Sequence, residues 1–154
     1  MLNNLTTMPQ IAMEWQPFEH LSVDALYEVL RFRQNIFVVE QSSPYPDLDG
    51  LDQEARHLLL RSEGELAGYL RLIPMPIRIG RVAVASHFRG RGLGRRLMEE
   101  GLRFCTERYP AQDIILAAQL NLVPLYSSFG FAVISEPYDD FGVMHVEMRM
   151  RPRG

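Results

Sequence analysis

The stretch RVAVASHFRGRGLGRRLMEEGL, residues 81–102, decides the fold. It opens as an apolar, β-branched run typical of a strand, crosses a loop in which arginine and glycine alternate, and continues with the apolar spacing of a helix. The first amides of a helix lack intrahelical partners, and glycines ahead of them let the backbone come close to an anion. Four arginines, at positions 89, 91, 95 and 96, lie within the same eight residues, so this junction predicts a site for a polyphosphate ligand.

Two common phosphate-binding motifs do not fit this loop. A Walker loop requires Gly-Lys-Ser/Thr, and the chain contains no lysine. A dinucleotide-binding fingerprint, Gly-x-Gly-x-x-Gly, fails because Arg95 and Leu97 stand where its third glycine would fall, counted from Gly90 or from Gly92. Two interpretations remain: another phosphate-containing ligand, or a glycine-rich surface turn with solvated arginines and no ligand.

Length and composition favour one globular domain, which we expect to span residues 11–150. Of the 154 residues, 47% are hydrophobic and 23% are charged, and both values are ordinary for such a domain. No apolar run approaches the roughly 20 residues of a membrane span, and the first residues lack the features of a signal peptide. The sequence therefore predicts a cytoplasmic protein that does not enter a membrane.

The net charge and the cysteine count argue against further classes of protein. The net charge is −3, and no basic stripe interleaved with aromatic residues is visible, which argues against nucleic acid as a partner and against a DNA-associated role. The single cysteine, Cys105, excludes an internal disulfide and argues against a Cys/His zinc cluster. We expect no bound metal and a basic site confined to the loop.

The pattern of apolar residues and turn residues predicts an α/β fold with the order β-α-β-β-β-α-β-α-β-β. Ser22 is expected to cap the first helix, whose stripe of helical spacing passes through Val29, Arg33 and Phe37. Strands are expected within residues 11–21, 56–73 (two strands around a turn at 62–64), 77–86, 113–119, 131–136 and 142–150, and helices over residues 23–41, 93–109 and 122–131.

The glycine-arginine loop resembles the acetyl-CoA motif of the GNAT family of N-acetyltransferases. In that family a strand is followed by Arg/Gln-x-x-Gly-x-Gly/Ala, and VAVASHFRGRGLGRRLM fills this pattern with Arg89, Gly92 and Gly94. The resemblance implies the GNAT fold, a mixed but mostly antiparallel central sheet flanked by helices, and acetyl-CoA as co-substrate.

A second motif later in the chain supports the same resemblance. LAAQLNLVPLYSSFGF is similar to the family pattern Asn-x-x-Ala-x-x-Leu-Tyr-x-x-x-Gly-Phe, with matches at 125–126 and 130–131. Gln119 and Leu122 replace the usual Asn and Ala. Four further stretches, RFRQNIFVVEQSSPYPDLDGLD, RHLL, GRVAV and FGVMH, resemble the ElaA-like branch of the family, with Val143-Met144 in place of Ile-Pro.

The resemblance implies how acetyl-CoA would be held. The loop amides from Gly90 to Arg95 would bind the pyrophosphate, and the strand before them would pair with the pantetheine arm. An N–H near Ala83 or Val84 would polarise the thioester carbonyl. The implied coenzyme-binding residues are Val82, Ala83, Val84, Arg89, Gly90, Arg91, Gly92, Leu93, Gly94, Arg95 and Gln119.

The implied reaction is transfer of an acetyl group from a thioester to a primary amine of a small molecule or peptide. The amine must lose a proton, because alkyl amines have pKa values near 10.4 in the manner of lysine, and the departing thiolate must gain one. The resemblance places Tyr126 beside the sulfur as the acid. For the base we expect Glu40 or His57, with His145 or a water chain as alternatives; each of these side chains could instead be purely structural.

Some questions stay open at this point. The acidic stretch with Asp47, Asp49, Asp52 and Glu54 is either a solvated loop or a device that attracts a cationic acceptor. A non-catalytic acyl-CoA-binding or regulatory module of the same fold is the alternative to an enzyme. An unpaired strand edge would allow a homodimer. The acceptor amine remains unidentified.

Overall fold

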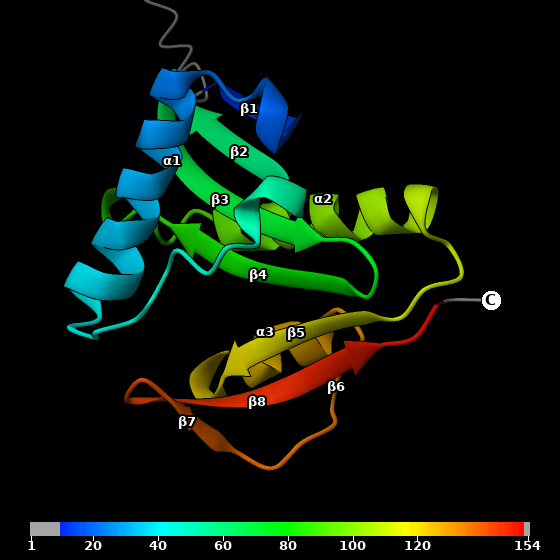
Figure 1. Cartoon of the computed structure of the whole chain (residues 1–154). Helices are drawn as coiled ribbons and strands as arrows, with labels where there is room; N and C mark the ends of the chain where they lie inside the picture. Colours follow the sequence, from blue (N-terminus) through cyan, green and yellow to red (C-terminus); the bar gives the residue numbers. More distant parts are fainter. Residues whose placement is uncertain (1–9, 153–154) are drawn as a thin grey trace, which may run out of the picture.

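The computed structural model describes residues 10–152 (Figure 1). The strands are β1 (Ile11–Pro17), β2 (Arg56–Ser62), β3 (Glu65–Ile73), β4 (Ile77–Val84), β5 (Ile114–Gln119), β6 (Ala132–Val133), β7 (Tyr138–Asp140) and β8 (Val143–Met150). The helices are α1 (Val23–Gln34), α2 (Leu93–Arg108) and α3 (Val123–Ser128). Short helical turns are η1 (Phe18–His20), the π-helical η2 (Asn35–Glu40), η3 (Asp52–Glu54), η4 (Ser86–Phe88) and η5 (Leu120–Leu122).

The expected α/β class and the expected order of elements are confirmed, with one strand added. Ser22 caps α1, since its Oγ accepts a hydrogen bond from the amide of Ala25 at 3.0 Å. The first helix departs from the prediction: it is α-helical only to Gln34 and then continues as η2. The strand expected over residues 131–136 is reduced to β6, and the short β7 was not predicted because its three residues are polar and carry no apolar alternation.

The sheet has eight strands in the order β1-β2-β3-β4-β5-β8-β6, with β7 also paired to β8. Every pairing is antiparallel except that of β4 with β5. This parallel pairing joins only Ile77–Ile79 to Ile114–Leu116. Beyond these residues β4 and β5 separate, and Figure 1 shows the sheet opening between them.

Helices cover both faces of the sheet, and the strands alternate to serve both. Leu58 and Leu60 point into the larger core, which α2 and α3 cover, whereas Leu59 between them packs toward α1. α1 contributes Val29 and Phe32 to this smaller core. Burial on two sides explains why consecutive residues at the centres of β2 and β3 are apolar, such as Leu58–Leu60.

Two further findings concern membrane-spanning helices and metal-binding clusters. Within residues 10–152, no helix combines the length and the apolar character needed to cross a membrane. The same residues contain no cluster of three or more His, Cys, Asp or Glu side chains arranged to hold a metal ion.

Candidate active site

The glycine-arginine loop lies directly after β4 and before α2. Gly90 and Gly92 have φ values of 80° and 74°, a backbone conformation that favours glycine. Gly92 is the N-cap of α2 and offers no side-chain cap, so the first amides of this 16-residue helix stay open to a ligand. The exposed side chains of Arg91, Arg95 and Arg96 form no ion pair with any residue that the structure describes. The loop therefore presents both amide donors and positive charge.

Gly94 is a glycine that the fold itself does not require. Its φ is not positive, and an added Cβ would only approach a methyl carbon of Val84 at 4.0 Å, an ordinary contact. Gly101, farther along α2, differs because an added Cβ would lie 3.2 Å from Leu70 Cδ1 in the core. The free space at Gly94 faces the end of β4, where a ligand could approach the helix closely.

The separated part of β4 carries a bulge. Tyr69 of β3 pairs with Ala83 and Arg71 pairs with Gly80, so Leu70 faces both Arg81 and Val82. Arg81 adopts a φ of 53°, which is strained for a residue with a side chain. On the side of β5, β4 has no strand partner beyond Ile79 in the described part of the chain, so this backbone edge is open to pair with an extended ligand.

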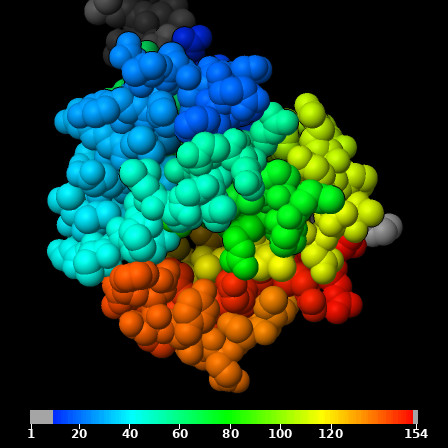
Figure 2. Space-filling model, viewed as in Figure 1, coloured from blue at the N-terminus to red at the C-terminus, as the bar shows by residue number. Residues whose placement is uncertain are grey.

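A cavity lies where β4 and β5 diverge. Val82 of β4, Gln119 of β5 and Tyr126 of α3 line it, together with His145 of β8. Residues 37–45 form the opposite wall, and Ser43 Oγ donates a 2.7 Å hydrogen bond to the carbonyl oxygen of Phe141 in the β7–β8 turn. Figure 2 shows this segment, in cyan, against the orange-red β7–β8 turn.

Tyr126, the expected acid, lies on the cavity wall. Its side chain is buried, and burial raises the pKa of Tyr126 to about 12. The hydroxyl therefore remains protonated at neutral pH and can donate a hydrogen bond to an anion that forms in the cavity.

A row of polar side chains crosses the β5–β8–β7 part of the sheet on the cavity side. Gln119 pairs with His145, which in turn pairs with Tyr138, and paired residues of antiparallel strands share a face. His145 Nδ1 lies 2.8 Å from the carbonyl oxygen of Val143. Because a carbonyl only accepts, we assign the ring proton to Nδ1, which leaves Nε2 as a proton acceptor at the cavity.

The structure does not bring the two expected bases, Glu40 and His57, to the cavity wall. Glu40, at the end of η2, forms an ion pair with Arg89 of the phosphate loop. His57 is buried: its Nε2–H donates to the carbonyl oxygen of Asp52 at 2.9 Å, and its Nδ1 accepts from the Tyr69 hydroxyl at 2.5 Å. Burial lowers the pKa of His57, so the ring is neutral and both nitrogens are occupied. These contacts argue against a base role for either residue.

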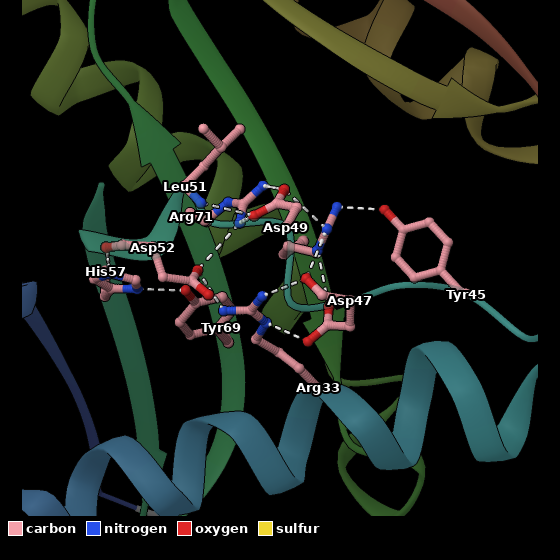
Figure 3. Close-up of polar contacts among 10 residues, drawn as sticks. Arg33, Tyr45, Asp47, Asp49, Leu51, Asp52, His57, Tyr69 and Arg71 are labelled. Carbon is pink, nitrogen blue, oxygen red and sulfur yellow. Dashed lines mark hydrogen bonds and ion pairs between the residues drawn. The ribbon is translucent and has the colours of Figure 1, made fainter. Parts of the chain in front are cut away.

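The three aspartates of the acidic stretch are bound by arginines, which argues against both expectations for them, whereas Glu54 is exposed. Figure 3 shows its aspartates bound to arginines. Arg33, fully buried, contacts Asp52 at 2.7 Å and Asp47 at 3.0 Å. Arg71 contacts Asp49 at 2.7 Å and Asp52 at 3.1 Å. Arg81 completes the network with contacts to Asp47 at 2.9 Å and Asp49 at 3.2 Å.

This network was missed at the sequence level, although one signal was present. Arg33 occupies a position on the apolar stripe of the first helix, and a charged side chain there must find opposite charges in the core. The pairing with aspartates 14 and 19 residues later was not predicted. Its effect on the site is positional, because it fixes the bulged Arg81 and with it the course of β4.

Sequence comparison identifies relatives over most of the chain. A family model described as acetyltransferase (GNAT) domain matches residues 29–152. The protein ElaA of Escherichia coli is 40% identical over 145 residues, which cover 88% of this chain and 95% of ElaA. The family-model match includes the loop, the cavity wall and the ion-pair network.

Solved structures show the same architecture. The crystal structure of E. coli ElaA superposes with a TM-score of 0.87 at 37% identity and covers 92% of this chain and all of ElaA. An acyl-CoA N-acyltransferase from Pseudomonas aeruginosa gives the same TM-score at 34% identity, over 92% of this chain and 99% of that protein. A GNAT acetyltransferase from Elizabethkingia anophelis, crystallised with acetyl-CoA bound, shares the fold at 16% identity, with a TM-score of 0.61 over 92% of this chain and 97% of its own.

Proposed function

Since this chain belongs to the GNAT family of acetyltransferases, in its ElaA-like branch, we propose that it transfers the acetyl group of acetyl-CoA to a primary amine of a small molecule or peptide. The amine attacks the thioester directly while both substrates are bound. The observation that supports this proposal is that three features follow one another along β4 and the start of α2. They are the open amides at the start of α2, the unpaired edge of β4, and the phenol of Tyr126 in the cavity between β4 and β5.

The residues present fit acetyl-CoA. The amides of residues 90–95 suit a pyrophosphate, as do the side chains of Arg91, Arg95 and Arg96, which form no ion pair within the described chain, and the space left by Gly94 lets it come close to the backbone. The open edge of β4 suits the amide groups of a pantetheine arm. An N–H near Ala83 or Val84 would then donate to the acyl oxygen.

The chemistry requires one bond to form and one to break. The nitrogen–carbon bond of the amide forms, the carbon–sulfur bond breaks, the amine loses a proton and the thiolate gains one. Tyr126 would donate a hydrogen bond from its hydroxyl to the departing sulfur, and its raised pKa means that this hydroxyl acts more as a hydrogen-bond donor than as a strong acid. In this role the tyrosine stabilises charge that develops only as the bond breaks.

Among the candidate bases, His145 has the best position. It lines the cavity, its Nδ1–H is fixed by the carbonyl of Val143, and its Nε2 is free to accept a proton from the amine. Glu40 instead neutralises Arg89, and His57 supports Asp52 and Tyr69 from within the core. We therefore propose His145, directly or through a water molecule, as the base.

Two measurements test the function. Titration calorimetry with desulfo-coenzyme A should show saturable binding, and acetyl-CoA should raise the melting temperature in a dose-dependent manner. Thiol release, followed with DTNB across a panel of amines, amino acids and peptides, should then exceed the rate without acceptor. Coenzyme binding without thiol release for any acceptor would instead support a non-catalytic acyl-CoA-binding module, and a flat titration would overturn both.

A further inference from the structure

The carboxylates around the cavity differ in one respect, which is whether an arginine holds them. Asp47, Asp49 and Asp52 are bound by the arginines of the network, and Glu147 is bound by Arg78 at 2.9 Å. The negative charge of each of these four carboxylates is neutralised by an arginine.

Asp140 is different. It lines the cavity from the end of β7 and is half-buried, and no cation lies within ion-pair distance of it in the part of the chain that the structure describes. Strand alternation turns Asp140 to the cavity side together with Tyr138, whereas Asp139 between them is exposed and pairs with Met144. A half-buried carboxylate without a partner is a binding group for a cation.

Two tyrosines lie close enough to this carboxylate to be affected by its charge. Burial and the negative charge of Asp140 together raise the pKa of Tyr45, against the opposing effect of Arg81, and they act in the same direction on Tyr138. The ring of Tyr45 also meets that of Phe141 edge-on, with centroids 5.9 Å apart. The Tyr45 ring already carries the guanidinium of Arg81 at 4.8 Å, so Asp140 itself is the group left for a ligand. In the described part of the chain no further acidic, histidine or cysteine side chains join it in a metal-binding cluster, which favours an organic cation over a metal ion that needs several oxygen ligands.

We infer that Asp140 binds a second positive charge of the acceptor, so that the acceptor is a diamine or another primary amine that carries a further cationic group. The inference rests on the proposed acetyltransferase function. The cation at Asp140 is not the reacting nitrogen, because a neighbouring carboxylate would hold that nitrogen in its protonated, unreactive form.

The geometry of the sheet sets the separation of the two groups. Neighbouring strands lie about 4.8 Å apart, so β7 lies about 10 Å from β5, whose end leads to Tyr126. A chain of several methylene groups between the two nitrogens spans this distance. The acceptor therefore has its charges at opposite ends of a flexible chain.

Three six-carbon probes test this inference: α,ω-diaminohexane, hexylamine, and ε-aminocaproate, which end in a cation, a methyl group and an anion. Each is titrated into the protein saturated with desulfo-coenzyme A. We expect diaminohexane to bind about tenfold more tightly than hexylamine, and aminocaproate to bind most weakly. Asp140→Asn should reduce the affinity for diaminohexane to that for hexylamine.

Asp139→Asn is the matched control, since it removes the same charge from the adjacent, exposed position. It should keep the preference for diaminohexane, and both variants should bind desulfo-coenzyme A as the wild-type protein does, which also shows that they fold. Equal affinities for the three probes, absent binding of diaminohexane, or a preference that survives Asp140→Asn would overturn the inference. If desulfo-coenzyme A still binds in those cases, the proposed acetyltransferase function stands.

Discussion

Gly94 and Gly101 lie on the same helix but have different reasons to be glycine. Gly101 packs against Leu70, so the core accounts for it. Gly94 has neither a core neighbour nor a positive φ, so nothing within the described chain accounts for it. A residue that the fold leaves unexplained, at the end of a loop rich in positive charge, is best explained by the ligand.

Gly94→Ala should separate binding from folding. Alanine is the better helix former by about 1 kcal/mol, so the variant should be at least as stable as the wild-type protein. The added methyl group should nevertheless lower the affinity for desulfo-coenzyme A about tenfold or more, because it occupies the space that the pyrophosphate would take. Calorimetry and thermal melting measure the two effects. Gly101→Ala is the control, and it should keep the affinity; an unchanged affinity in Gly94→Ala would contradict the proposed contact.

Tyr126→Phe removes one oxygen from the cavity wall. We expect kcat to fall about a hundredfold, with the KM for acetyl-CoA unchanged, because the hydroxyl acts only as the sulfur departs. Thiol release in the presence of an accepted amine gives both constants. Tyr138→Phe, on the far side of the same cavity row, should retain its kcat. Full activity of Tyr126→Phe would exclude the tyrosine as the acid.

At the scale of elements, ion pairs hold the segment between η2 and β2 in place. Residues 41–51 form no strand or helix, yet Asp47 and the neighbouring Asp52 of η3 are buried. Arginines from three different elements, α1, β3 and β4, hold this segment against the sheet. The network thus joins the segment before β2, which lines the cavity with Ser43 and Tyr45, to the bulged strand β4.

Asp52→Asn should therefore cost more than a surface substitution. It leaves the buried guanidinium of Arg33 and that of Arg71 with one negative partner fewer, and breaking a buried ion pair costs about 3 kcal/mol or more. Urea unfolding at neutral pH measures the loss. Glu54→Gln, two residues away and exposed, should change the free energy of unfolding by less than about 0.5 kcal/mol. Equal stabilities of the two variants would rule out the network as a source of order.

At the scale of the whole molecule, the same carboxylates determine how stability depends on acid. Partial burial would raise the pKa of Asp49, but its contacts with Arg71 outweigh this and lower the pKa to about 2. The pKa of Asp52 is lowered by Arg33 and Arg71 against a similar effect of burial. In the unfolded chain both return to about 3.9, so the unfolded state binds more protons in this range.

The contribution of these two carboxylates to the free energy of unfolding should therefore be constant above about pH 5 and fall as the pH decreases from about 4 toward 2. His57, whose pKa is lowered by burial, adds a separate loss that begins as the pH falls through about 6.5. Urea unfolding at a series of pH values measures this slope. Asp49→Asn should be less stable than the wild-type protein at pH 7 and should lose less stability on acidification, because it lacks one of the titrating groups. Parallel curves for the two proteins would contradict the assignment.

Local patterns explain which parts could be predicted from sequence. The strand, loop and helix around Gly92 are adjacent in the chain, so the spacing of residues was enough to predict that they lie together. The fold and the phosphate loop could be predicted from this pattern. Arg81 and Asp47 are 34 residues apart, and only the closed sheet brings them into contact. The same holds for Glu40 and Arg89, whose pairing removed a candidate base, and for Asp140, which lies on a strand too short to show a pattern.

If acetyl-CoA binds as proposed, the hydrogen bond from Ser43 to Phe141 would limit the width of an acceptor that reaches the thioester. It ties the segment above the opening to the turn beyond β8, so the diverging strands are spanned rather than left as an open trough. A rigid, bulky carrier of the amine would collide with this span. Only a slender appendage could thread beneath it, such as a free metabolite or the unfolded tip of a polypeptide, and lysines on the rounded surface of a folded protein would be left unmodified.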